Sequence, residues 1–343
     1  MRGQSRRDVC PGRRALNRQT AGMDDLERHN PQRPKGKRST KSAPSTSHGL
    51  TARIVGAFGR HYLAQLDDGT VLACVPRGKR AEVVCGDRVT LAPGDAPLAI
   101  EQVHARRNAL WREDLWRSKM FAANLDRVML VTATYPGIQH GLIGRALIAA
   151  DAADIPSTLL LNKCDLPQAE AARAEMRLYR DLGYEVLELS VRTDPQAALA
   201  VLTPLLSGQT TLLLGASGVG KSSLTNLLAP QAQAPTREIS EALSAGKHTT
   251  TATRLYDLPG FPPGSVLMDS PGFQSFGLHH LSVSQLQHGF PEIRARNGQC
   301  RFQNCTHRDE PGCVFTTDPQ AISASRLALY RTLYAELTSA APR

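Results

Sequence analysis

The segment GASGVGKSS, residues 215–223, constrains the fold of this 343-residue chain more than any other stretch. It fits the pattern G-x-x-x-x-G-K-[ST], in which glycines let the backbone wrap a phosphate chain and successive N–H groups point inward. An apolar run precedes it and a helical run follows, which predicts a loop between a strand and a helix whose positive end faces phosphate. Lys221 is predicted to bridge the β- and γ-phosphates of a nucleotide, and Ser222 to bind Mg²⁺. The predicted phosphate-binding residues are Gly215, Ala216, Ser217, Gly218, Val219, Gly220, Lys221, Ser222 and Ser223.

The tetrapeptide NKCD, residues 162–165, follows an apolar run and is expected at the carboxyl end of a buried strand. Asp165 can accept hydrogen bonds from N1–H and the exocyclic amine of guanine, a pair of donors that adenine does not offer together. Asn162 is predicted to tie the base edge to the phosphate loop, and the stem of Lys163 to pack along the ring. Cys164 is expected to be a packed thiol within this motif. In the later run LSV, Ser190 is predicted to shape a turn whose backbone N–H meets guanine O6.

Two further loops are expected to sense the end of the phosphate chain. In DSPG, which follows the apolar run VLM, Asp269 is predicted to hold Mg²⁺ through water and the Gly272 N–H to meet the γ-phosphate. In GKHTTT, residues 246–251, Thr250 is predicted to complete the Mg²⁺ shell, and Thr249 is the close alternative. A threonine run in a loop is usually only solvated, so this prediction depends on the neighbouring motifs.

The group that would orient an attacking water is not at its usual place. Ras-like sites carry a glutamine directly after the DxxG glycine, whereas Phe273 follows Gly272 here. Intrinsic hydrolysis is therefore expected to be slow. His248 is the candidate for orienting the water because imidazole can accept a proton near neutral pH, and the alternative is an ordinary exposed loop histidine. The predicted catalytic set is His248, Lys221 and Thr250.

The remaining patterns predict two different β architectures. From residue 125 onward, buried-strand runs alternate with helical stretches, which is typical of a mostly parallel α/β sheet with its loops at the carboxyl edge. Residues 49–110 instead contain five short strands with hairpin turns, and these predict an OB-fold barrel that binds single strands or RNA; a mere docking barrel is the alternative. The basic residues near its loops and strand ends favour RNA: Arg53, Arg60, Arg77, Lys79, Arg80, Arg106 and Arg107.

A cluster of metal-ligand residue types follows the nucleotide motifs. The run CRFQNCTHRDEPGC places Cys300, Cys305, His307 and Cys313 within fourteen residues. Three thiolates and one imidazole suit tetrahedral Zn²⁺, and a site filled by four protein ligands is structural rather than catalytic. Free reduced cysteines are the alternative. Residues 318–337 are then expected to form a closing helix, with Asp318 as its cap and Pro319 in its first turn.

Charge is concentrated at the N-terminus. The chain carries +10 overall, and residues 1–48 hold 12 of its 41 Lys and Arg but 4 of its 31 Asp and Glu. This stretch has too few apolar residues to fold alone, and we expect a disordered basic tail. It can be a solvated tail (with Met23 as a possible start), an arm for nucleic-acid phosphates or a transit peptide. No apolar run reaches the ~18–20 residues that span a bilayer, so no membrane partner is expected. The chain is also expected to be a cytoplasmic monomer.

The order of these motifs is a permutation of the usual GTPase series, because NKxD and the serine turn precede the phosphate loop, the threonine loop and DxPG. With a barrel before and a Cys/His cluster after, the chain resembles the family of ribosome small-subunit-dependent GTPase A (RsgA). The resemblance covers about residues 49–343 and implies a multi-domain chain, with an OB-fold barrel at 49–110, a circularly permuted α/β P-loop GTPase domain at 111–284 and a mainly helical zinc-binding domain at 285–343. The basic tail, residues 1–48, lies outside the resemblance. The resemblance further implies a GTPase that binds the small ribosomal subunit and its rRNA, is activated by it and acts late in subunit maturation.

The permutation suggests a hypothesis about signalling. Because the guanine-binding half is already built, the chain leaving Gly272 can enter the C-terminal domain, so a γ-phosphate that orders this glycine could reposition that domain. Two other classes of protein remain as alternatives. A P-loop kinase or ATPase is disfavoured by NKCD, and an RNA-binding protein with a relic nucleotide site is disfavoured by the intact Lys221, Ser222 and Asp269.

Overall fold

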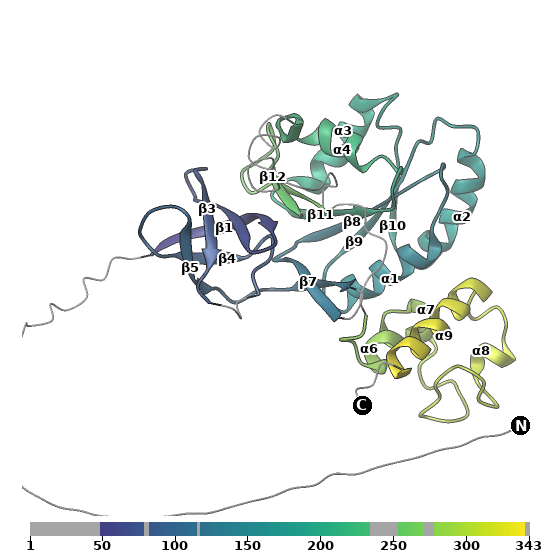
Figure 1. Ribbon diagram of the computed structural model, residues 1–343. Coiled ribbons are helices and arrows are strands. Elements are labelled where there is room, and N and C mark those ends of the chain that lie inside the picture. The colour runs from purple at the N-terminus through teal and green to yellow at the C-terminus, as the bar shows by residue number, and fades with distance from the viewer. Residues whose placement is uncertain (1–48, 79–81, 115–116, 234–252, 271–277, 340–343) are drawn as a thin grey trace, which may run out of the picture. The chain divides into compact units, whose positions relative to one another are not determined.

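The computed structural model describes residues 49–78, 82–114, 117–233, 253–270 and 278–339, and for residues 112–114, 117, 118 and 233 only the backbone (Figure 1). Within these ranges, no helix combines the length and apolar character needed to cross a membrane.

Five strands close the predicted barrel. They are β1 (Leu50–Phe58), β2 (His61–Gln65), β3 (Val71–Pro76), β4 (Arg88–Leu91) and β5 (Leu98–Val103). Strand β1 is long enough to pair with β4 through its first half and with β2 through its second, and a parallel β3–β5 pair completes the ring. Alternate side chains such as Ile54, Ala64 and Val89 fill the interior with less than 1% exposure. The five-stranded OB-type barrel is therefore confirmed.

The central sheet has the predicted parallel character. Its strands β8 (Arg127–Ala133), β9 (Ser157–Asn162), β10 (Glu185–Glu188), β11 (Thr210–Gly215) and β13 (Val266–Asp269) are parallel, in the order β10-β9-β8-β11-β13. Strand β12 (Arg254–Asp257) is antiparallel to β13 and joins the sheet to the barrel, because Gly56 of β1 pairs with Arg254. A hairpin of β6 (Ala109–Asp114) and β7 (Arg117–Ala123) lies between barrel and sheet in the sequence.

Two apolar cores cover the two faces of this sheet. In β8, Val128 and Leu130 belong to one core while Met129 and Val131 belong to the other, as the alternation of a pleated strand requires. Helices α1 (His140–Asp151) and α2 (Ala169–Asp181) cover the first face. Helices α3 (Pro195–Leu206) and α4 (Lys221–Leu228) cover the second, and a short 3₁₀ turn at Pro230–Gln233 follows α4 (Figure 1).

The C-terminal module, residues 278–339, is mainly helical. It contains α6 (Val283–His288), α7 (Pro291–Ala295), α8 (Val314–Thr317) and α9 (Ala324–Ser339). The closing helix begins later than predicted: Asp318 accepts a hydrogen bond from the Gln320 N–H in a preceding turn, and Ser323 Oγ accepts from the Arg326 N–H. A local turn therefore competes with the first helical turn that the Asp–Pro pair predicted.

Helix α9 packs directly on α1. At Gly144 a Cβ atom would lie 2.3 Å from Leu329 Cδ2, so any larger residue there would require the Leu329 side chain to shift. Arg145 of α1 forms a two-pronged ion pair with Glu336, with N–O distances of 2.8 and 2.5 Å. Behind it, the Arg326–Glu292 pair ties α9 to α7 at 2.8 Å, with side chains only 4% and 8% exposed. Removing one partner of such a buried pair costs about 3–5 kcal/mol, because the other charge is left buried and unpaired.

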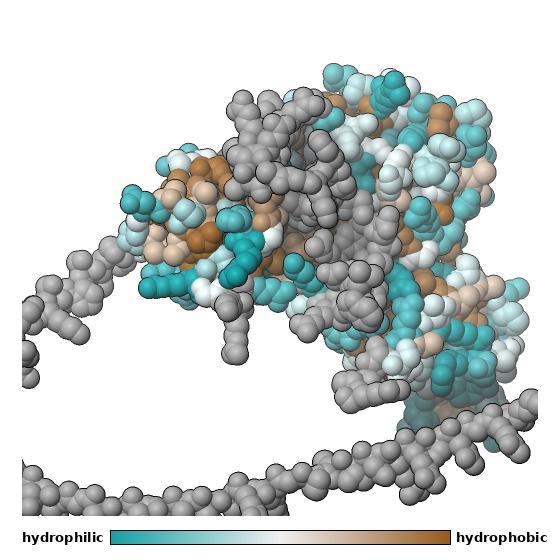
Figure 2. Space-filling view, in the orientation of Figure 1, coloured by the Kyte–Doolittle hydropathy of each residue, from teal (hydrophilic) through white to brown (hydrophobic). Residues whose placement is uncertain are grey.

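The face drawn in Figure 2 is mostly hydrophilic, with scattered apolar residues. Large apolar side chains that remain exposed among the described residues are few: Leu50, Val71, Tyr135, Val201 and Phe302.

Candidate functional site

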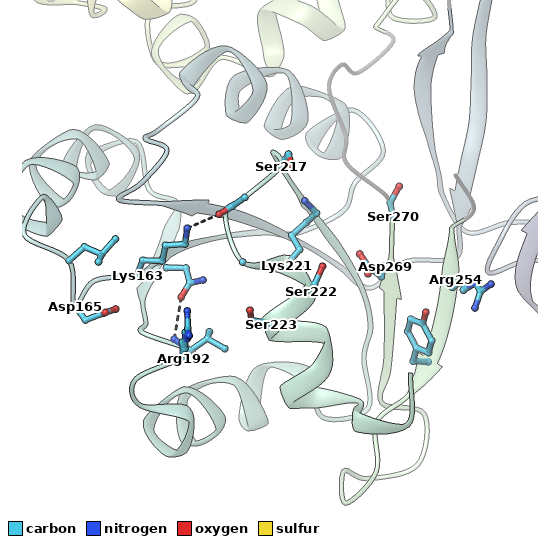
Figure 3. A pocket seen from close by; sticks show the side chains of 16 residues that line it. Lys163, Asp165, Arg192, Ser217, Lys221, Ser222, Ser223, Arg254, Asp269 and Ser270 are labelled. Carbon is cyan, nitrogen blue, oxygen red and sulfur yellow. Dashed lines mark hydrogen bonds between the residues drawn. The ribbon is translucent and has the colours of Figure 1, made fainter. Parts of the chain in front are cut away.

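A cleft of about 880 Å³ opens at the carboxyl edge of the central sheet. It collects the ends of β9, β11 and β13, as expected for an α/β sheet (Figure 3). Its walls come from both halves of the motif series: Asn162, Lys163, Asp165, Leu166, Val191, Arg192, Ser217, Gly218, Gly220, Lys221, Ser222, Ser223, Arg254, Tyr256, Asp269 and Ser270.

Asn162 links three loops of this cleft. Its Nδ2 donates to the carbonyl of Val219 in the phosphate loop at 2.9 Å, and its Oδ1 accepts from the Val191 N–H in the serine turn at 3.2 Å. The side chain is buried, so both hydrogen bonds are shielded from water. The predicted tie between the base-reading motif and the phosphate loop is present in this geometry.

Gly220 makes room for that link. Its φ is +101°, and a Cβ atom there would lie 2.3 Å from Asn162 Nδ2. Any other residue would therefore be strained and would also push against the amide. A contact with another loop thus explains why the second fixed glycine of the G-x-x-x-x-G-K-[ST] pattern is required here.

Lys163 also connects the NKCD loop to the phosphate loop, on the solvent-exposed side. Its Nζ donates to the carbonyl of Gly218 at 2.7 Å and to that of Tyr135 at 2.9 Å, as drawn in part in Figure 3. Thr134 Oγ1 in turn donates to the Lys163 carbonyl at 2.8 Å. The lysine stem is thus fixed along one wall of the cleft, beside Asp165.

Lys221 and Asp269 face the phosphate end of the cleft with opposite charges. Lys221 Nζ donates to the carbonyls of Gly215 and Ala216 at 2.8 and 2.7 Å. Thr225 Oγ1 donates to Asp269 Oδ2 at 3.4 Å. Burial lowers the pKa of Lys221 and raises the pKa of Asp269, and each group partly offsets the shift of the other. An anion beside Lys221 and a cation beside Asp269 would therefore both be favoured.

The other predicted residues occupy different places. Asp165 lines the cleft at the end opposite Asp269 (Figure 3), and its carboxylate makes no hydrogen bond with any described residue. Ser190 shapes a turn, since its carbonyl accepts from the N–H groups of Thr193 and Asp194. Cys164 does not line the cleft. Its thiol donates to the Leu161 carbonyl at 3.3 Å, and burial raises its pKa, so it is a packed thiol.

Four predicted residues or alternatives lie outside the described residues: His248, Thr249, Thr250 and Gly272. Conversely, Arg192, Arg254 and Tyr256 line the cleft but lie outside the sequence motifs, and Ser270 lines it from within DSPG, where no role was predicted for it. Arg192 and Ser270 each directly follow a predicted motif residue. Arg254 and Tyr256 lie on β12, and only the long-range pairing of Arg254 with Asp269 brings them to the site.

The four predicted metal ligands of the C-terminal module come together. Their ligand atoms all lie within 4.8 Å of one another. His307 Nδ1 is 3.5 Å from Cys300 Sγ and 3.6 Å from Cys313 Sγ, and these two sulfurs are 4.0 Å apart. Metal–sulfur bonds of ~2.3 Å and metal–nitrogen bonds of ~2.0 Å in a tetrahedron would place the ligand atoms roughly 3.5–3.8 Å apart.

The surroundings of this cluster fit a metal ion. Burial lowers the pKa of His307, which favours the neutral imidazole that ligates. Burial raises the pKa of Cys305 to about 12, so its thiolate needs a nearby cation. The Val314 N–H points at Cys300 Sγ at 3.4 Å, as a donor to a ligating thiolate would. The cluster can therefore bind one metal ion.

Replacing Cys313 with serine tests this cluster. Because it removes one of four ligands, we expect the affinity for a divalent metal to fall at least about tenfold and the thermal unfolding of the C-terminal module to shift down. Metal content of the purified protein and melting with and without a chelator measure both. Cys74→Ser, in the barrel core, is the matched control and should keep the metal. Equal metal content in the two variants would contradict a site built from these four residues.

Comparisons with known proteins agree with this geometry. A family model described as RsgA GTPase matches residues 103–279. A protein of Ralstonia pickettii named small ribosomal subunit biogenesis GTPase RsgA is 51% identical over 284 residues, which cover 82% of this chain and 89% of that protein. A protein of the same name from Paraburkholderia phymatum is 47% identical over 308 residues, covering 89% and 96%.

Two solved structures share the fold. The circularly permuted GTPase YloQ matches with a TM-score of 0.61 and 25% identity, over 88% of this chain and 99% of that one. YjeQ from Thermotoga maritima matches with a TM-score of 0.62 and 26% identity, over 84% and 98%. The permuted order, the barrel and the GTP hydrolase class predicted from the motifs are thereby confirmed. The chain belongs to the RsgA GTPase family.

Proposed function

We propose that this GTPase hydrolyses GTP to GDP and phosphate in the biogenesis of the small ribosomal subunit, and that the subunit activates it. A role in small-subunit biogenesis is supported by the names of two relatives, which share about half of their residues with this chain over most of its length. The observation that carries the chemistry is the pair of Asn162 hydrogen bonds, which build one cleft from a base-reading loop and a phosphate loop.

Guanine selection would take place at the Asp165 end of this cleft. The carboxylate lines the cleft with both oxygens free to accept from guanine N1–H and the exocyclic amine. Lys163, held by two carbonyls, would lay its stem along the ring, while the turn at Ser190 would present a backbone N–H to O6. Adenine offers a different pattern at this edge, which disfavours the kinase and ATPase alternatives.

The phosphates would lie over residues 215–223, where the N-terminus of α4 and the Lys221 ammonium provide positive charge. Ser222 and Asp269, with Thr250 from the threonine loop, are the proposed Mg²⁺ ligands, Asp269 through water. When bound, Mg²⁺ would neutralise charge that develops on the phosphate oxygens. Lys221 would then exchange its two carbonyl partners for phosphate oxygens, and the Gly272 N–H would meet the γ-phosphate.

The attacking water would be oriented by His248. Phe273 has no polar group for this task, so the unassisted rate is expected to be low. A subunit that fixes the threonine loop would raise turnover by holding His248 and Thr250 in place. This arrangement makes activation a consequence of positioning.

We further propose that the Cys/His cluster holds one structural Zn²⁺, since three thiolates and one imidazole are typical zinc ligands. The proposed working form is a cytoplasmic monomer that contacts rRNA, with domains at 49–110, 111–284 and 285–343 after a basic tail at 1–48. The metal would stabilise the loop that carries its ligands and would take no part in hydrolysis.

Asp165→Ala tests the guanine assignment. Loss of a carboxylate that accepts two hydrogen bonds should weaken GDP binding by about 2–4 kcal/mol, or roughly 30- to 1,000-fold, and leave weak ATP binding unchanged. Titration of both nucleotides onto wild type and variant measures this. Asp181→Ala, at the end of α2 and outside the cleft, is the control. A similar loss of affinity for both nucleotides would contradict a base-specific role.

The proposed process is tested by GTP turnover with small subunits, large subunits, free RNA or no addition, with ATP as the control substrate. We expect slow basal turnover that only small subunits stimulate, by an order of magnitude or more. Lys221→Ala should abolish both the basal and the subunit-stimulated GTP turnover. Equal turnover in every mixture would overturn the role in small-subunit biogenesis while leaving the GTPase chemistry in place.

A further inference from the structure

Strand β12 connects the barrel to the nucleotide cleft, because it lies between barrel strand β1 and sheet strand β13. Its first residue, Arg254, pairs with Gly56 of β1 on one side and with Asp269 of β13 on the other. Asp269 is one of the proposed Mg²⁺ ligands, and Arg254 and Tyr256 line the cleft themselves (Figure 3). A displacement of β12 would therefore reach the phosphate end of the cleft directly.

Three polar side chains hold the last residue of β12 against the barrel. Asp257 accepts a hydrogen bond from Arg53 Nη2 at 3.0 Å on one carboxylate oxygen and from Gln65 Nε2 at 2.7 Å on the other. Arg53 Nη2 also donates to Gln65 Oε1 at 3.2 Å, which closes the triangle. Arg53 on β1 and Gln65 on β2 are opposite each other in register, so two paired strands present them together. We call Arg53, Gln65 and Asp257 the β12 clamp.

An aromatic contact holds the first residue of β12. The Arg254 guanidinium lies over the Phe58 ring of β1, 5.1 Å from its centroid. The register between β1 and β2 shifts between Ile54 and Gly56, and such a bulge bends a strand and redirects its side chains. Together with the clamp at Asp257, the barrel therefore contacts both ends of this four-residue strand.

The clamp lies between separate apolar cores. The barrel interior is one core, drawn from residues 52–103, and the two faces of the sheet carry two others. A groove of about 230 Å³ runs beside the clamp and is lined in part by Arg53, Gln65 and Asp257. Because no described side chain fills this groove, polar contacts rather than packing set the position of β12 at this point.

Asp257 also connects to the helix that follows the phosphate loop. Its carbonyl accepts from Gln231 Nε2 at 2.9 Å, and Gln231 belongs to the 3₁₀ turn after α4, the helix that begins at Lys221. One residue thus contacts the barrel and the end of the phosphate-loop helix. The Asp257 side chain is 56% exposed, and ion pairs at such exposure add little to stability, so positioning explains the arrangement better.

We propose that Arg53 and Gln65 of the barrel are positioning residues for GTP hydrolysis, which act through Asp257 and β12. The clamp keeps β12 in the position at which Asp269 faces Lys221 across the phosphate end of the cleft. A displacement of about 1 Å that originates far from the reacting atoms is enough to slow an enzyme strongly. The barrel is then part of the hydrolytic machinery itself. The proposal requires that the chain hydrolyses GTP, and it does not require activation by the small subunit.

Steady-state GTP turnover of the full-length protein, without subunits, tests the clamp. Arg53→Ala and Asp257→Ala should each lower kcat about 2- to 30-fold, the range for residues that influence a site without contacting its ligand. GDP affinity should stay within about twofold of wild type, because the base and phosphate contacts remain. The double variant should be no slower than the slower single variant, because both substitutions remove the same contact.

Asp67→Ala is the matched control. Asp67 lines the same groove and forms an ion pair with Arg88 at 3.4 Å, but that pair lies within the barrel and does not reach β12. Its kcat should equal that of wild type, and the melting curves of all variants should show the same folded state. Asp257→Ala is the most informative variant because it removes an exposed side chain.

Three results would overturn the clamp: wild-type kcat in Asp257→Ala, an equal loss of kcat in Asp67→Ala, or losses of the two single variants that multiply in the double variant. A loss confined to GDP affinity would overturn it as well, because the clamp is proposed to act on the reaction. Failure of small subunits to stimulate wild type would overturn the proposed function and leave this test of the clamp unchanged.

Discussion

The side-chain amide of Asn162 holds the nucleotide cleft together. An amide donates and accepts at once, and Asn162 uses both abilities, toward the carbonyl of Val219 and the N–H of Val191. Three loops that follow β9, β10 and β11 therefore meet at one buried side chain. Gly220 is needed because a side chain there would occupy the space of this amide. The base-reading and phosphate-binding ends of the cleft keep their spacing through this contact, whichever of them comes first in the chain.

Because of the permuted order, the C-terminal module directly follows the strand that ends at the phosphate end of the cleft. The chain leaves β13 at Asp269, beside the phosphate end of the cleft, and enters the module by residue 278. The hypothesis that the module is repositioned by nucleotide has to account for its packing on α1. Leu329 lies against Gly144, and Glu336 forms a two-pronged ion pair with Arg145. These contacts favour a module that stays on α1.

Local patterns predicted the features that depend on neighbours in sequence. The phosphate loop, the NKCD loop and the Cys/His cluster each depend on a few residues at fixed spacing, and alternating apolar residues predicted the barrel and the parallel strands. The pairing of β12 with β1 was not predictable, because register between Gly56 and Arg254 is set by contacts nearly two hundred residues apart. The sequence did not reveal Arg254 and Tyr256 in the cleft either, because only the pairing of β12 with β13 brings them there. The start of α9 was mispredicted because a turn at Asp318 replaced the expected cap.

Amide hydrogen exchange at Val191 in an Asn162→Asp and an Asn162→Ala variant tests the central role of Asn162 most directly. Aspartate keeps an oxygen that can accept from the Val191 N–H but loses the donor to Val219, whereas alanine loses both. We therefore expect Val191 to stay protected in the aspartate variant and to exchange fast in the alanine variant. The backbone amides of β9 and β10 should still exchange slowly in both variants. GDP binding should be weakened in both. Slow exchange at Val191 and wild-type GDP affinity in the alanine variant would contradict the account.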